Sequence, residues 1–156
     1  MKTQSCPFCS ARIKEISFLE SESFLAIYNR SPVLPGHSLI IPKKHYTSML
    51  ELSPEERFEM TELGVKAIKG LLVVFQAVAF DWTVQEGEPA GQTIPHLHVH
   101  LLPRHPGDLP RPGDWYPRLE KNIREQQIDS DQRPAYSHEQ LIQIAKKIKG
   151  YFRKNE

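Results

Sequence analysis

The feature that most constrains this sequence is an alternation of histidine and aliphatic residues between positions 91 and 104. His96, His98 and His100 occupy every second position, and aliphatic residues fill the gaps between them. In a β-strand, residues i, i+2 and i+4 share one face. The pattern therefore predicts a strand whose aliphatic face packs in the core and whose three imidazoles project from the other face.

The spacing of these histidines argues against one catalytic metal ion held by all three. Residues i and i+4 of a strand lie about 13 Å apart, whereas metal–nitrogen bonds are about 2 Å long. A neutral imidazole can instead attack phosphorus directly and form an intermediate that water then breaks. His98, with His100 beside it, is best placed as that nucleophile. Gln92 and Thr93 offer hydrogen-bond donors for phosphate oxygens at the strand entrance.

The overall composition predicts a single domain of residues 1–156, long enough to bury a core. A net charge of +1 gives no reason to expect nucleic-acid or membrane binding. No apolar run approaches the roughly 20 residues of a membrane span, and the start lacks an apolar signal core. We therefore expect a cytoplasmic protein. Its two cysteines, Cys6 and Cys9, favour a metal or redox pair over a structural disulfide.

Local patterns predict an α+β domain built on an antiparallel sheet of about five strands. Strands are expected at residues 16–19, 24–28, 37–41 and 79–85 and in the histidine stretch. The last two of these should pair antiparallel, because a short turn joins them. The proline-rich residues 105–134 are expected to be mobile.

Two helices complete the expected fold. Ser53 and Glu56 form a capping box that opens a long central helix, which runs to about Gln76. Its apolar residues at roughly helical spacing are Phe58, Val65, Ile68, Leu72 and Phe75. Ser137 caps a C-terminal helix over residues 137–153.

The histidine alternation at residues 96–102 resembles the signature of the histidine triad superfamily, His-φ-His-φ-His-φ-φ, where φ is apolar. Residues 28–37 resemble the nucleoside-side loop of that superfamily. Residues 85–93 and 102–108 are most similar to its fragile histidine triad branch, the dinucleoside polyphosphate hydrolases. The resemblance covers residues 18–108 and implies the corresponding fold, with a continuous sheet across a homodimer.

The resemblance also implies a role for each matching residue. His98 would attack the α-phosphate and become a nucleotidyl-histidine, while His100 and Gln85 contact phosphate. Asn29 would hold the ribose, and His37 would lie behind the triad as its partner. The residues implied to line the phosphate and substrate site are Gly91, Gln92, Thr93 and Ile94.

Simpler interpretations exist for several of these positions. Asn29 can be a turn residue, Gln85 an exposed strand residue and His37 a satisfied buried histidine. Arg104 is attractive for phosphate, but a solvated or structural arginine is favoured there.

The implied substrates are adenine-containing dinucleotides such as diadenosine triphosphate or tetraphosphate, with Mg²⁺ or Mn²⁺ on the phosphates. The products would be AMP and the remaining nucleotide. Two alternatives use the same site, namely an adenosine phosphoramidase and a nucleotidyltransferase. A third alternative is a regulatory protein that binds the nucleotide and signals without needing turnover.

A second site is predicted near the N-terminus. Cys6 and Cys9 need two further ligands to form a closed tetrahedral zinc site. Zinc-bearing bacterial and archaeal members of the superfamily resemble this chain in a cysteine pair, a histidine after Pro-Lys-x and the first triad histidine. Those positions here are Cys6, Cys9, His45 and His96. The alternative is a pair of reduced thiols without metal.

Overall fold

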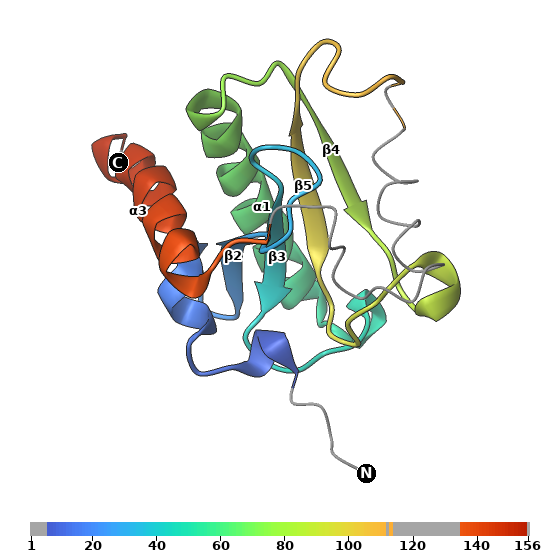
Figure 1. Cartoon of the computed structure of the whole chain (residues 1–156). Helices are drawn as coiled ribbons and strands as arrows, with labels where there is room; N and C mark the ends of the chain where they lie inside the picture. Colours follow the sequence, from blue (N-terminus) through green and yellow to red (C-terminus); the bar gives the residue numbers. More distant parts are fainter. Residues whose placement is uncertain (1–5, 112, 114–134, 156) are drawn as a thin grey trace.

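The computed structural model describes residues 6–111, 113 and 135–155 (Figure 1). Within these residues, five strands form one antiparallel sheet in the order β1-β2-β3-β5-β4. The strands are β1 (Ser17–Glu20), β2 (Phe24–Tyr28), β3 (Ser38–Pro42), β4 (Ala79–Val84) and β5 (Val99–Arg104). The predicted α+β fold with an antiparallel sheet is confirmed, and the predicted strand positions agree to within about a residue apart from the histidine stretch.

The two helices also lie where their sequence signals indicated. α1 (Pro54–Val74) lies behind the sheet, and α3 (His138–Lys154) packs against β1, β2 and α1 (Figure 1). The side chains of Ser53 and Ser137 each accept a hydrogen bond from the backbone N–H of the third helical residue. The side chain of that third residue in turn accepts a hydrogen bond from the backbone N–H of the serine, so both helices begin with a capping box. No helix in the described ranges has both the length and the apolar character of a membrane span.

The buried face of α1 differs from the apolar set that indicated the helix. Phe58 is 69% exposed, whereas the buried residues are Met60, Leu63, Gly64, Ala67, Ile68, Gly70 and Leu71. A Cβ on Gly64 would lie 2.2 Å from the Trp82 ring, and one on Gly70 would lie 2.1 Å from Phe152. Large rings thus sit over glycines on the inward face. Apolar residues occur on more than one side of α1. Their spacing therefore predicted a helix but did not show which side of the helix faces the sheet.

The histidine stretch requires a correction, because β5 begins at Val99 and not before the first histidine. β4 ends at Val84, which pairs with Val99, so the chain N-terminal to Val99 has no ladder with β4. His96 and His98 therefore lie in the non-strand segment that immediately precedes β5. Leu97 holds that segment by donating its backbone N–H to the carbonyl of Tyr46 at 2.7 Å. The Leu97 side chain still packs in the main core, as predicted.

Most of the segment predicted to be mobile, residues 105–134, lies outside the described residues. Its first part, residues 105–111, is anchored to the sheet. Arg104 at the end of β5 makes a two-pronged contact with Asp108 at 2.9 and 2.8 Å and a further contact with Asp81 at 2.6 Å. These contacts give Arg104 the structural role that the sequence favoured over phosphate binding.

The Arg104 contacts predict an acid-sensitive contribution to stability. The Arg104 guanidinium lowers the pKa of Asp108 from 3.8 to about 2. A carboxyl group with a lowered folded-state pKa stabilises the fold above its unfolded-state pKa, and this contribution is lost as the pH falls through the folded-state value. We expect Asp108→Asn to lower the free energy of unfolding at pH 7 by about 2 kcal/mol.

Denaturant unfolding of Asp108→Asn and wild type between pH 2 and 7 measures this difference. The gap between the two proteins should narrow below about pH 4. Asp81→Asn is the matched control, because the Asp81 side chain is 34% exposed and makes one contact with Arg104. A gap that stays constant with pH, or an equal effect of Asp81→Asn, would contradict the prediction.

Candidate functional site

One face of the sheet gathers the residues that were predicted to act on phosphate. His100 pairs with Leu39 of β3 and with Thr83 of β4, and paired residues point to the same face of a sheet. His37 lies two residues before Leu39, and Gln85 lies two residues after Thr83. Strand alternation therefore brings His37 and Gln85 to the face that carries His100. The α1 helix covers the opposite face.

A hydrogen-bonded pair of buried histidines lies at the centre of this face. The backbone N–H of Val33 donates to Nδ1 of His37 at 3.1 Å. A neutral imidazole has one donor and one acceptor, so Nε2 of His37 carries its proton. Nε2 lies 2.9 Å from Nδ1 of His100 and donates to it. By the same rule, Nε2 of His100 carries a proton, and His100 is a hydrogen-bond donor.

Asn29 stands next to this pair. Its Oδ1 accepts a hydrogen bond from the backbone N–H of Ser31 at 2.9 Å, which closes a turn. Its Nδ2 lies 3.3 Å from Nε2 of His37. The two interpretations of Asn29 are therefore compatible, because its carbonyl shapes the loop while its amide group lies beside the histidine pair.

His98 is held in one orientation with one nitrogen available. Its Nδ1 lies 2.8 Å from the backbone carbonyl of His96, so Nδ1 carries the proton and donates it. The lone pair of a neutral His98 is consequently on Nε2. Burial lowers the pKa of His98, which keeps the ring neutral at pH 7. The His98 and His100 rings are 5.0 Å apart between centroids.

Gln92, expected to contact substrate, joins two connecting segments of the chain through its own side chain. Its Oε1 accepts the backbone N–H of Gly87 at 2.7 Å. Its Nε2 donates to the carbonyl of Thr47 at 3.1 Å and lies 3.5 Å from the carbonyl of His96. The Gln92 amide therefore braces the loop between β4 and β5 internally and ties it to the segment that follows β3.

The other residues expected to line the substrate site form the edge of the same loop. Gly91 has a φ of +96° and Gly87 one of +80°, a backbone region that favours glycine. Thr93 is exposed, and Ile94 is partly buried against the core. Gly91 therefore has a conformational reason for its identity, whatever it contacts.

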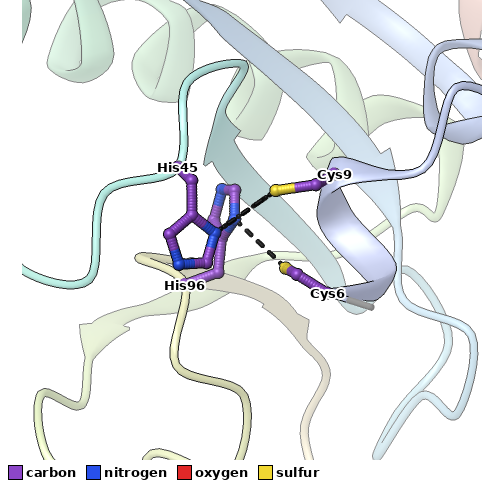
Figure 2. Close-up of side chains that lie close together, drawn as sticks. All are labelled: Cys6, Cys9, His45 and His96. Atoms are coloured by element: carbon purple, nitrogen blue, oxygen red, sulfur yellow. Dashed lines mark hydrogen bonds between the residues drawn. The ribbon is translucent and has the colours of Figure 1, made fainter. Parts of the chain in front are cut away.

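The four predicted zinc ligands come together from three separate parts of the chain, as Figure 2 shows. Cys6 precedes a short 3-10 helix, η1 (Pro7–Cys9), and Cys9 is its last residue, while His45 follows β3 and His96 precedes β5. Their ligand atoms all lie within 4.8 Å of one another. Sγ of Cys9 is 3.2 Å from Nδ1 of His45, and Sγ of Cys6 is 3.4 Å from Nδ1 of His96.

These separations fit a tetrahedral zinc site. Zinc bonds of about 2.0–2.3 Å place neighbouring ligand atoms about 3.3–3.8 Å apart, and the Nδ1 atoms of His45 and His96 are 3.2 Å apart. Nε2 of His96 donates to the carbonyl of Pro42 at 3.0 Å, which leaves the Nδ1 lone pair directed at the cluster. Burial also lowers the pKa of His96, so Nδ1 is available to a metal. The cluster is a possible metal site of the zinc type.

The five-stranded sheet and the buried histidine pair beside a neutral third histidine define a histidine triad fold. The HIT domain family matches residues 10–107. The chain belongs to this family.

Relatives and solved structures agree with this assignment. The asymmetrical bis(5'-nucleosyl)-tetraphosphatase of Schizosaccharomyces pombe is 33% identical over 134 residues, which is 80% of this chain and 74% of that protein. The bis(5'-adenosyl)-triphosphatase of Dictyostelium discoideum is 31% identical over 148 residues, 93% of this chain and 90% of that protein. The diadenosine triphosphate hydrolase of Plasmodium falciparum, solved with cyclomarin A, has a TM-score of 0.71 and 25% identity over 90% of this chain and 78% of its own.

Two features of the site were not predicted from the sequence. Phe8, between Cys6 and Cys9, packs against the rings of both His96 and His98. Glu86 accepts hydrogen bonds from the Ser48 hydroxyl and from the backbone N–H of Met49. An apolar residue inside Cys-Pro-Phe-Cys was a signal for the first feature. The second joins residues far apart in sequence and had no such signal.

Proposed function

We propose that this protein hydrolyses dinucleoside polyphosphates, such as diadenosine triphosphate or tetraphosphate, through a covalent nucleotidyl-His98. The observation that carries the proposal is the orientation of His98. Its Nδ1 is tied to the carbonyl of His96, so the Nε2 lone pair of a buried, neutral ring faces the site. The naming of related proteins as hydrolases of such substrates supports an enzyme of this class.

The proposed reaction has two steps. Nε2 of His98 attacks the α-phosphorus, a phosphorus–nitrogen bond forms, and the bridging phosphorus–oxygen bond breaks with its electrons on the leaving nucleotide. Water then attacks the phosphorus, its oxygen stays on AMP, a proton is released to solvent, and the phosphorus–nitrogen bond breaks with its electrons on His98, which returns to the neutral form. Nε2–H of His100 is a donor for the phosphate oxygens, with its tautomer set by His37. Gln85 is proposed as a second phosphate contact and Asn29 as the ribose contact.

A substrate panel tests the reaction class. Diadenosine triphosphate, diadenosine tetraphosphate and adenosine 5'-phosphoramidate would each be incubated with Mg²⁺ or Mn²⁺, and the products separated by chromatography. We expect AMP and the complementary nucleotide from the dinucleotides. Faster cleavage of the phosphoramidate would identify a phosphoramidase, and nucleotide transfer to added phosphate or sugar phosphate a transferase. Tight binding with negligible turnover would identify a regulatory nucleotide-binding protein.

We further propose that Cys6, Cys9, His45 and His96 hold a structural zinc ion. Four protein ligands close the tetrahedron, so the ion would anchor the N-terminal segment to the sheet and leave His98 and His100 for chemistry. Cys6 and Cys9 are free thiols in the structure. Paired thiols suit a reducing compartment, which is why we propose a cytoplasmic location.

We also propose a homodimer that pairs through β4. In the described residues β4 lies at the edge of the sheet, with β5 as its neighbour. An exposed edge strand with apolar side chains promotes pairing with another chain. Phe80 on β4 is 47% exposed, Val78 just before it is 75% exposed, and Phe58 on α1 is 69% exposed. A second copy of the chain would cover these residues.

Phe80→Glu is expected to convert the dimer into a monomer, because a carboxylate buried at an interface without a partner is strongly unfavourable. Light scattering coupled to size exclusion measures the mass directly. Lys147→Glu, an exposed change on α3, is the control and should leave the mass unaltered. A wild-type monomer at micromolar concentration, or an unchanged mass for Phe80→Glu, would refute pairing through β4.

A further inference from the structure

Besides the ring of His100, two neighbours set the position of the ring of His98, the proposed nucleophile. The carbonyl of His96 holds one edge through the hydrogen bond to Nδ1. Phe8 contacts the ring itself, at 5.6 Å between centroids and an interplanar angle of 60°. One hydrogen bond leaves a ring free to pivot about that bond, and a packed aromatic neighbour restricts this motion. Phe8 therefore limits the directions in which Nε2 of His98 can point.

Phe8 occupies this position because of the turn that carries it. It lies in η1, where Pro7 restrains the backbone and the N–H of Cys9 donates to the carbonyl of Cys6 at 3.1 Å. Pro7 and Cys9 are exposed, whereas Phe8 is 9% exposed. The turn thus directs the two thiols toward the histidine ligands and the ring between them toward the interior. Phe8 contacts the ligand His96 as well, at 5.5 Å between ring centroids.

Two kinds of contact hold this turn against the rest of the molecule, namely the burial of Phe8 in the hydrophobic core and the contacts of the two thiols. Among the described residues, every hydrogen bond that joins residues 6–11 to a residue beyond position 13 is a contact between a cysteine sulfur and an imidazole of His45 or His96. A metal ion shared by these four side chains would replace three weak contacts with strong bonds. Loss of the cluster would therefore leave the burial of Phe8 as the main attachment of the turn, and the ring would be held less tightly against His98.

We propose that Phe8 is a positioning residue for His98 and that it transmits the state of the Cys₂His₂ cluster to the nucleophile. The inference rests on the proposed role of His98 in hydrolysis. When the cluster is formed, Phe8 packs against the His98 ring and holds Nε2 of His98 in the orientation that in-line attack on the substrate α-phosphorus requires. When the cluster is lost, the turn is released and the ring of His98 gains freedom, while the residues that bind substrate keep their positions.

The first test compares substitutions that remove or keep the aromatic ring of Phe8 with the removal of a buried ring elsewhere. Phe8→Leu keeps an apolar side chain but removes the ring, and we expect kcat to fall about tenfold with KM nearly unchanged. Phe8→Tyr keeps the ring and should restore kcat to within about twofold of wild type. Phe152 lies on α3 and is 7% exposed. Phe152→Leu removes its buried ring and should lower the free energy of unfolding without lowering kcat. Metal content is measured for each protein.

A spectroscopic test does not depend on activity. Long-range proton–nitrogen correlation spectra of the imidazoles report which nitrogen of His98 carries the proton and whether the ring has one environment. We expect one set of His98 signals in wild type and Phe8→Tyr, with Nδ1 protonated, and broadened or averaged signals in Phe8→Leu. If wild type has no hydrolytic activity, the proposed function fails, whereas the spectra still decide the role of Phe8.

A double-substitution cycle tests the link to the cluster. Introduced alone, Cys9→Ser should reduce kcat and broaden the His98 signals. Added to Phe8→Leu, it should change kcat and the signals little further, because both substitutions weaken the same contact between Phe8 and His98. Independent effects that multiply would mean that the cluster acts on His98 through the His96 backbone, and would overturn the proposal. Unchanged kcat and unchanged His98 signals in Phe8→Leu would also overturn it.

Discussion

His98→Asn is expected to bind diadenosine polyphosphates and to hydrolyse them at least about 10⁴-fold more slowly than wild type. Asparagine is shorter than histidine and its amide nitrogen has no basic lone pair, so no covalent intermediate can form. The proposed substrate contacts, His100, Gln85 and Asn29, belong to other positions and are unchanged. Steady-state rates measured by chromatography, together with calorimetric affinity for the intact substrate, give the two quantities.

The matched control is His138→Asn, because His138 lies on α3 and pairs with Glu15 away from the sheet face of the site. It should retain the wild-type rate. A wild-type reaction stopped in alkali should also contain a nucleotidylated peptide that includes position 98, since phosphorus–nitrogen bonds to imidazole are stable in base. Near wild-type hydrolysis by His98→Asn, or a nucleotide attached elsewhere, would exclude the proposed mechanism.

Loss of the metal site has the largest expected effect on stability. We expect wild type purified without added zinc to contain about one equivalent of zinc per chain, and Cys6→Ser to contain little. Because a structural metal contributes its binding free energy to folding, Cys6→Ser should lower the free energy of unfolding by about 3 kcal/mol or more. Elemental analysis and chemical denaturation measure the two effects.

A chelator provides the internal control for this prediction. Wild type stripped of metal should unfold at the same denaturant concentration as Cys6→Ser, whose own unfolding should not respond to the chelator. Arg12→Ser, an exposed change close to the cysteine pair, should keep both metal and stability. Less than about half an equivalent of zinc in wild type, together with unchanged stability of Cys6→Ser, would exclude a structural zinc ion.

Local signals in the sequence were sufficient for most of the fold. The capping residues Ser53 and Ser137 located the starts of both helices, because they satisfy backbone N–H groups that have no partner within the helix. The alternation around Val99 located the last strand, although not its first residue. Strand boundaries depend on where the partner ends, and β4 ends at Val84.

For the site, the sequence identified the residue types but not how each is used. The meeting of Cys6, Cys9, His45 and His96 followed from ligand chemistry and from resemblance. The use of the Gln92 amide as a brace between loops did not, because its partners are backbone groups that no side-chain pattern reveals. The side of α1 that faces the core was also not predicted. Two glycines on that side leave room for the large rings of Trp82 and Phe152, which are distant in sequence.

The separation of the two faces of the sheet has a consequence for how this protein can vary. Val99 and Leu101 face the core, whereas His98 and His100 face the site, and all four lie on one short length of backbone. In a saturation mutagenesis experiment, cellular abundance and turnover would be scored separately. The affected property should then alternate between abundance and turnover from each of these positions to the next. Changes at positions 99 and 101 would deplete the protein, whereas small polar substitutions at positions 98 and 100 would leave a folded but inactive product. Stability and catalysis are consequently open to separate selection at consecutive residues.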